Sequence, residues 1–262
     1  MHATATSVPL LPPFWRRVAG VGRLSLATTC AVALIFRFQW GLGSITFEPG
    51  NFFAYLTMQS NIAFAVVTAG AGILMLRGRA GPRWMNGLRA GVLTCTVTAG
   101  IVFAAIVQQS SARGVRVDVP WSDVLLHFVL PVLALVDWVG TPHTRPPFRL
   151  LVFVLGYVGT WGGITMLRGE TTGWYPYFFL DPNQTDGPAE FLLLSGIALA
   201  VFALVGLGLI AIPPTRGSTP RTGRGSAGRE PAGQRHPARS DRVRSRLPRS
   251  PRAQGGRSPG EG

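Results

Sequence analysis

Long apolar runs separated by short polar segments dominate the pattern along this chain. A helix needs about 20 mostly apolar residues to cross the hydrocarbon core of a bilayer. Six runs reach or approach that length, so the pattern predicts an all-α fold, a polytopic membrane bundle of six transmembrane helices. The predicted spans are Val18–Trp40, Asn51–Leu76, Met85–Gln108, Trp121–Val139, Phe148–Leu167 and Ala189–Ile212.

The two ends of the chain differ from this transmembrane domain, 18–212. Residues 1–17 form a short polar leader, predicted to be cytoplasmic. Residues 213–262 are mainly Arg, Pro, Gly and Ser, and such a segment cannot bury enough apolar surface to fold, so we predict a disordered tail. Its positive charge favours the anionic inner leaflet. It lacks interleaved aromatic residues and a folded module, which argues against nucleic-acid binding.

Charge supports the same class of protein and predicts its orientation. Only 14% of the residues are charged, against about 25% in a typical soluble domain. Arg16 and Arg17 precede the first span and three arginines follow the second, whereas the loop Gly41–Gly50 has a glutamate and no arginine. Arginine is enriched in cytoplasmic loops. We therefore expect a multi-pass protein of the cell membrane with both termini in the cytoplasm.

Polar side chains interrupt the second predicted span near its start. Thr57, Ser60 and Asn61 are spaced i, i+3 and i+4, so a helix places them on one face. Polar groups within a membrane should face protein rather than lipid. The stripe indicates either hydrogen bonds that hold the helices together or an active site.

His127 is the histidine that falls within a predicted span, and Asp123 shares its helix face four residues earlier. With cytoplasmic termini, the second and fourth spans both start outside. Thr57 and His127 each lie six residues past the start of their span, at Asn51 and Trp121, so about 9 Å along the helix. A hydroxyl beside a base that an acid orients is the arrangement of an activated nucleophile. Thr57, His127 and Asp123 are therefore the candidate catalytic residues.

Other polar residues are candidates for substrate binding. Gln59, Ser60 and Asn61 carry groups that can stabilise an oxyanion, and the sequence does not choose among them. Arg37, near the end of the first span, either extends to the interface, pairs with Asp123 or binds a substrate carboxylate.

The segment Arg168–Pro188 is aromatic. Trp174, Tyr175 and Tyr177 suit the membrane interface, so the segment is either an anchor or a lid over a pocket. Trp174 and Tyr175 are the candidate substrate contacts. Cys30 and Cys95 stand alone in apolar runs without metal-ligand spacing, so we expect no metal and no cofactor.

Three motifs, NFFAYLTMQSN, DVLLHFVLPVLALVDW and TGWYPYFFLDP, together resemble a group of bacterial six-span membrane proteins. That group is distantly similar to the androgen-induced and androgen-dependent TFPI-regulating protein family, multi-pass hydrolases of fatty acid esters of hydroxy fatty acids. The resemblance implies a Thr nucleophile matching Thr57 and a catalytic histidine matching His127. Trp174 and Tyr175 match an aromatic-Pro pattern before the last span. Asp123 is not part of the matched pattern, and the arginine-rich tail has no counterpart in it.

Two hypotheses follow for the function. The first is a threonine-dependent hydrolase of lipid esters in the outer leaflet, with membrane lipid and a lipid ester as its partners. The second is a non-catalytic lipid-binding or small-molecule transport protein, in which the polar stripe is packing or a substrate path. A transporter with inverted repeats should show two corresponding broken helices, and no clear pair is visible in the sequence.

Overall fold

The computed structural model describes residues 11–45, 47–79, 81–112 and 118–214. The chain divides into two units, residues 1–219 and residues 220–262. The predicted disordered tail lies outside the described residues except for its first two positions, and so does most of the predicted leader. The described residues of the first unit form helices and no β-strand. The helices are α1 (Pro13–Leu42), α2 (Pro49–Ala54), α3 (Leu56–Leu76), α4 (Arg83–Ala112), α5 (Trp121–Val124), η1 (Leu125–Val129), α6 (Leu130–Gly140), α7 (Arg149–Thr172), η2 (Phe178–Leu180) and α8 (Pro188–Ala211).

Six helical segments of this fold are long and apolar enough to cross a membrane: α1, α3, α4, the continuous run α5–η1–α6, α7 and α8. Each overlaps one of the six predicted spans, which confirms the all-α bundle. Large apolar side chains on their outer faces, such as Val66, Leu167 and Leu204, are mostly exposed. Apolar surface of this extent marks a face that contacts lipid or another protein. The chain is therefore a multi-pass membrane protein.

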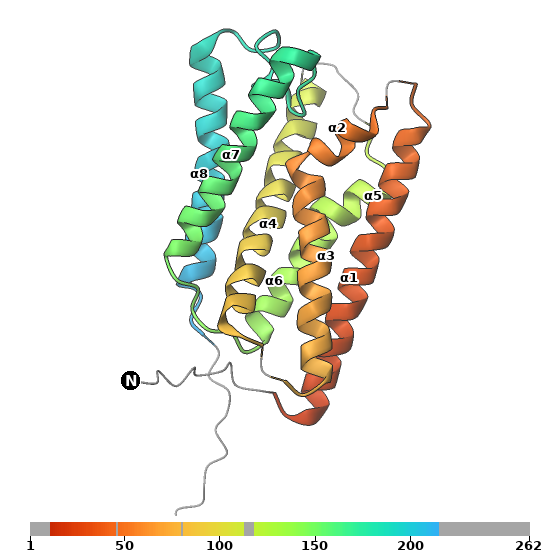
Figure 1. The fold of residues 1–262 in the computed structure, drawn as a ribbon, viewed down its shortest axis with the longest axis vertical. Coiled ribbons are helices and arrows are strands. Elements are labelled where there is room, and N and C mark those ends of the chain that lie inside the picture. The colour runs from red at the N-terminus through yellow and green to blue at the C-terminus, as the bar shows by residue number, and fades with distance from the viewer. Residues whose placement is uncertain (1–10, 46, 80, 113–117, 215–262) are drawn as a thin grey trace, which may run out of the picture. The chain divides into compact units, whose positions relative to one another are not determined.

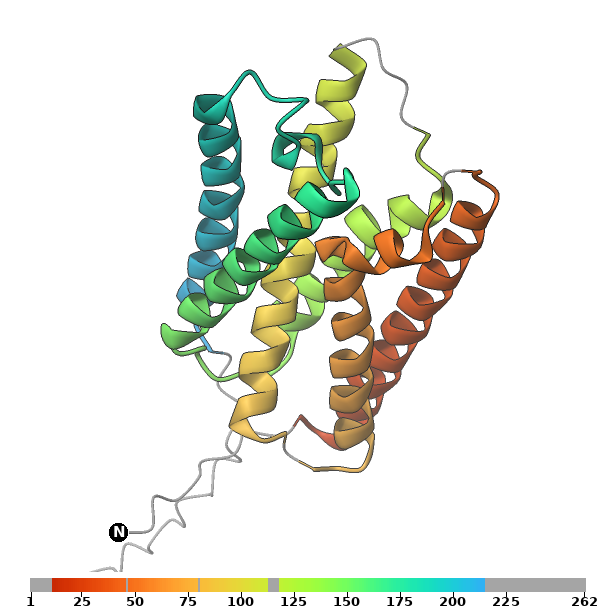
Figure 2. The same cartoon turned by 45° about the horizontal axis from the view of Figure 1, so that its top comes forward.

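Helix α4 is the centre of the bundle (Figures 1 and 2). It contacts α3 on one side, α7 and α8 on another, and η1 and α6 on a third. Helix α1 packs along α3 and also contacts α5, η1 and α6. Helix α3 and the π-helical segment η1 thus both pack against the same two helices, α1 and α4. We call the end of the bundle that carries α2 and η2 the α2 end.

The second predicted span is broken near its start. We expected one helix from Asn51, but α2 ends at Ala54 and α3 begins at Leu56, with an extended backbone at Tyr55 (φ −63°, ψ 128°). Thr57 is therefore the second residue of α3, and the expected depth of about 9 Å along an unbroken helix is wrong.

The break leaves carbonyl groups at the end of α2 without helical partners, and other side chains supply them. Trp161 of α7 donates from Nε1 to the Ala54 carbonyl at 2.9 Å. Gln59 donates from Nε2 to the Phe53 carbonyl at 3.0 Å. Unpaired backbone groups are costly where water is excluded. These bonds are the physical reason why the break is tolerated.

The fourth span contains a π-helical turn, η1, that includes His127. Pro131 lacks the N–H that would otherwise bond to the carbonyl of His127 four residues earlier, and a local change in helix winding accommodates the loss. Gly100 of α4 lies directly against that carbonyl, and any Cβ at this position would overlap the oxygen. Glycine at position 100 therefore lets α4 approach the backbone of η1.

A charged cluster stabilises the bundle at the end opposite to α2. Asp137 of α6 accepts hydrogen bonds from Arg23 of α1, whose Nε lies 3.0 Å from each carboxylate oxygen, and from Nη2 of Arg89 of α4 at 2.7 Å. Arg23 also donates to Thr141 at 2.8 Å. All three charged side chains are buried or nearly so. Both partners of Asp137 lie within spans.

Candidate functional site

Two cavities adjoin at the α2 end of the bundle, and residues of α3, α4 and the segment 173–187 form the wall between them. The first, the polar cavity, has a volume of about 490 Å³ and lies between α1, α2, α4, η1 and the segment 173–187. The second, the apolar cavity, has a volume of about 330 Å³ and lies between α3, α4, α7, η2 and α8. Both volumes fall in the range of small-ligand pockets, roughly 300–1,000 Å³. The residues that line both cavities are Thr57, Phe103, Ile106 and Tyr177.

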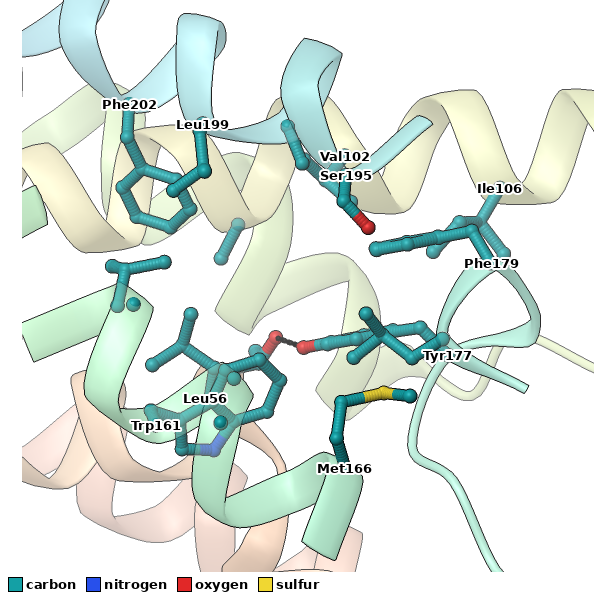
Figure 3. Close-up of a pocket in the computed structure, with 18 of the residues that line it drawn as sticks. Leu56, Val102, Ile106, Trp161, Met166, Tyr177, Phe179, Ser195, Leu199 and Phe202 are labelled. Atoms are coloured by element: carbon teal, nitrogen blue, oxygen red, sulfur yellow. Dashed lines mark hydrogen bonds between the residues drawn. The ribbon is translucent and has the colours of Figure 1, made fainter. Parts of the chain in front are cut away.

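The hydroxyl of Thr57 lies at this shared wall. The break at Tyr55 places Thr57 in the first turn of α3, where it is buried yet lines both cavities. Its Oγ1 lies 3.2 Å from the phenolic oxygen of Tyr177, and either group can donate (Figure 3). Burial raises the pKa of Tyr177 to about 12, although its hydrogen bond with Thr57 acts in the opposite direction. The phenol therefore keeps its proton at neutral pH and can donate a hydrogen bond beside Thr57.

His127 lines the polar cavity from η1. Its imidazole stacks on Phe103 with ring centroids 3.8 Å apart, and its Nδ1 lies 2.9 Å from the backbone carbonyl oxygen of Asp123. A carbonyl only accepts, so Nδ1 carries the proton and Nε2 holds a lone pair. The hydrogen bond found for this ring among the described residues is the one through Nδ1. His127 thus has the tautomer that a general base requires.

Asp123 and Arg37 form an ion pair at the rim of the polar cavity. Arg37 Nε donates to Asp123 Oδ1 at 2.8 Å, and the guanidinium lies 4.7 Å from the centre of the Trp40 ring. Three roles were considered for Arg37, and in the structure it pairs with Asp123. The carboxylate we expected to orient the imidazole faces Arg37 instead, while the backbone carbonyl of Asp123 orients His127.

The segment 173–187 covers the mouth of the bundle. Trp174 lines the polar cavity, stacks edge-on against Tyr55 and lies under the Arg168 guanidinium, 5.0 Å from the ring centre. Tyr175 does not line either cavity and packs on Gly169 of α7, where a Cβ would overlap the ring. The segment enters the bundle at Tyr177, so it has the position of a lid rather than of a surface anchor alone.

The other residues predicted for the site form hydrogen bonds with nearby backbone carbonyl groups. Asn61 is fully buried, donates to the Thr57 carbonyl at 3.0 Å and contacts Cys30, and Ser60 donates to the same carbonyl. Gln59 accepts a hydrogen bond from the Tyr157 hydroxyl at 2.7 Å. Neither Gln59 nor Asn61 lines either cavity. The structure therefore does not bring them to the site.

The sequence analysis did not name Phe103, and it placed Tyr177 at the membrane interface rather than in the site. Phe103 of α4 fixes the plane of the His127 ring, and Tyr177 contacts Thr57 across 120 positions of sequence. Tyr177 stood in a conspicuous aromatic motif, which is the signal that could have singled it out.

The chain was also compared with known proteins. No protein-family model matches it, and neither curated proteins nor solved structures gave a significant match. Function is therefore inferred from the geometry of the two cavities and from the residues between them.

Proposed function

We propose that this membrane protein hydrolyses a lipid ester, with Thr57 as the nucleophile and His127 as the general base. The main support is that Thr57 and His127 line the same polar cavity. Thr57 also lines the apolar cavity. An ester of a fatty acid needs both environments, with its carbonyl between them. The resemblance to membrane hydrolases that use a Thr and a His points to the same pair.

In the proposed reaction, the Thr57 oxygen bonds to the ester carbonyl carbon and its proton passes to Nε2 of His127. The C–O bond to the leaving alcohol then breaks, and the alcohol takes the proton from the imidazole. Water subsequently cleaves the acyl-threonine, with His127 again accepting and returning a proton. The protonated phenol of Tyr177 supplies a donor for the oxyanion.

The reaction requires one rearrangement. Without substrate, the Thr57 hydroxyl contacts Tyr177, and no hydrogen bond to His127 is found among the described residues. Catalytic hydrogen bonds are often long or absent before substrate binds. We propose that the ester carbonyl takes over the Tyr177 donor and frees the threonine to approach Nε2.

The test uses purified protein in lipid nanodiscs with a fluorogenic long-chain fatty acid ester. Thr57→Ala and His127→Ala should each lower kcat/KM by about 10²–10⁴-fold, and the double variant should be little worse than either single variant. Matched controls are Thr96→Ala, a buried threonine that bonds its own helix, and His143→Ala, a buried histidine elsewhere in the bundle. Wild-type rates in the Thr57 and His127 variants would refute the proposal.

A second candidate is a non-catalytic amphiphile-binding protein. The hydrogen bond between Thr57 and Tyr177, 3.2 Å long, favours this candidate. A threonine hydroxyl paired with a phenol can serve to hold the segment 173–187 in place without any catalytic role. Binding of the ester without any Thr57-dependent hydrolysis, in the same nanodiscs, would select this candidate.

A further inference from the structure

The apolar cavity exists because the helices around it carry small residues where they face one another. Helix α7 contributes Gly159, Gly162 and Gly163, and a Cβ built on any of them meets no atom within 4 Å. Helices α4 and α8 contribute Ala99 and Ala198. A Cβ at any of these three positions would therefore enter open space. The space is a consequence of the sequence of α7 and not of poor packing between large side chains.

The lining of this cavity suits an apolar chain. Its long walls are aromatic and aliphatic, with Trp161, Phe179 and Phe202 among them (Figure 3). The hydroxyl groups of the lining are those of Thr57 and Tyr177, which bond to each other, and that of Ser195. An apolar cavity does not hold ordered water, since a buried water needs two to four polar partners. The occupant must accordingly be apolar along most of its length and polar only at the Thr57 end.

The surroundings indicate where such an occupant comes from. The outer faces of α7 and α8 expose large apolar side chains, including Ile164, Leu167 and Leu193, and both helices are candidate membrane spans. The cavity therefore lies beside two helices that we expect to cross the bilayer, where acyl chains are the abundant apolar chains. The adjoining polar cavity, with Arg37 and His127, offers room for the group that an acyl chain carries.

We propose that the apolar cavity binds one acyl chain of a membrane lipid or fatty acid, with the carboxyl or ester group at Thr57, and that the lack of side chains at Gly162 and its neighbouring glycines makes room for a long chain. The chain runs from Thr57 along α7 and α8 toward Phe202. Ser195 lies along this path (Figure 3), and within the described part of the chain its buried hydroxyl has no hydrogen-bond partner. Ester cleavage at this site rests on the proposed function, whereas chain binding does not.

The experiment measures binding directly. Wild-type protein in phosphatidylcholine nanodiscs is irradiated with palmitic acid that carries a photoreactive diazirine in its chain, and the labelled peptides are identified by mass spectrometry. Label should fall on α7 and α8 around Met166 and Phe202, and excess unlabelled palmitic acid should remove it. Label that unlabelled palmitic acid does not displace would mean contact with bulk lipid and would overturn the proposal.

Variants then test the glycines. Gly162→Leu places a side chain in the cavity and should lower competed labelling about tenfold or more, since single methylenes in an apolar pocket change affinity by about 10–200-fold. Octanoic acid, which is shorter, should compete better in this variant, relative to palmitic acid, than it does in the wild type. Ser195→Leu fills the cavity from α8 and should act in the same direction. The control Gly196→Leu substitutes a glycine of α8 that also has open space but does not line the cavity.

The outcomes separate this inference from the proposed function. Equal loss of label in Gly162→Leu and Gly196→Leu, or no loss in Gly162→Leu and Ser195→Leu, would overturn the chain site even if Thr57-dependent hydrolysis is observed. The expected labelling pattern without hydrolysis would support the chain site and refute the enzyme. Thermal unfolding of each variant shows that the substituted proteins are folded.

Discussion

Replacement of Asp137 by asparagine should destabilise the bundle strongly, because it leaves two arginines without a counter-charge. The carboxylate accepts from Arg23 at 3.0 Å on each oxygen and from Arg89 at 2.7 Å, and the Arg23 side chain is only 3% exposed. Removing one partner of a buried ion pair costs about 3–5 kcal/mol. For a protein of this size, about 2–4 °C of unfolding temperature corresponds to each kcal/mol. We therefore expect a loss of roughly 6–20 °C.

The assay is thermal unfolding in detergent, followed by the fraction of monodisperse protein. Arg89→Met should cost less than Asp137→Asn, because Asp137 then keeps a one-to-one pair with Arg23. Asp186→Asn, on the exposed loop before α8, is the surface control and should change stability by less than about 0.5 kcal/mol. An unfolding temperature of Asp137→Asn within a degree of wild type would refute the reasoning, as would a larger effect from Arg89→Met.

Three further predictions concern packing and titration, and one concerns topology. Gly100→Ala should lower stability by about 1–3 kcal/mol in the same unfolding assay, since its methyl overlaps the carbonyl of η1. Trp161→Phe should lower the free energy of unfolding by about 1–3 kcal/mol, because it leaves the Ala54 carbonyl of α2 unpaired. An unchanged unfolding temperature would contradict this. Because burial raises the pKa of Tyr177 from 10 to about 12, the folded state should lose stability as pH rises through that interval, and Tyr177→Phe should remove that part of the loss. Reporter fusions after Ile212 and near Asn183 should read cytoplasmic and external, respectively; the reverse would overturn the arginine argument.

The six spans could be predicted from hydropathy because the bilayer fixes the length of any helix that crosses it. The break at Tyr55 could not, since no Pro or Gly marks it and its carbonyls are paired by Gln59 and by Trp161, 107 residues further on. By contrast, the irregular turn at His127 had a visible cause in Pro131. A break in a helix can be predicted from the sequence when a residue such as proline causes it. It cannot be predicted when side chains far along the chain stabilise it.

The candidate site, too, could be predicted from the sequence only in part. Thr57 and His127 were singled out because polar groups are costly within a membrane, and they line one cavity. The pairing of Asp123 with Arg37 was one of three open roles for that arginine, and distance along the sequence does not rank them. The contact of Tyr177 with Thr57 depends on the path of the segment 173–187, which hydropathy does not determine.

The bond from Trp161 to the end of α2 has a consequence for how the chain is assembled in the membrane. Synthesis runs from the N-terminus, so the second span enters the bilayer before α7 exists. Until α7 arrives, the Ala54 carbonyl lacks the indole that pairs with it, and an unbroken helix would satisfy that carbonyl better. We therefore expect the kink that places Thr57 between the two cavities to form late, when the fifth span docks on the earlier ones. A nascent chain that stops before Arg149 holds all three candidate catalytic residues but lacks the contact that shapes their site.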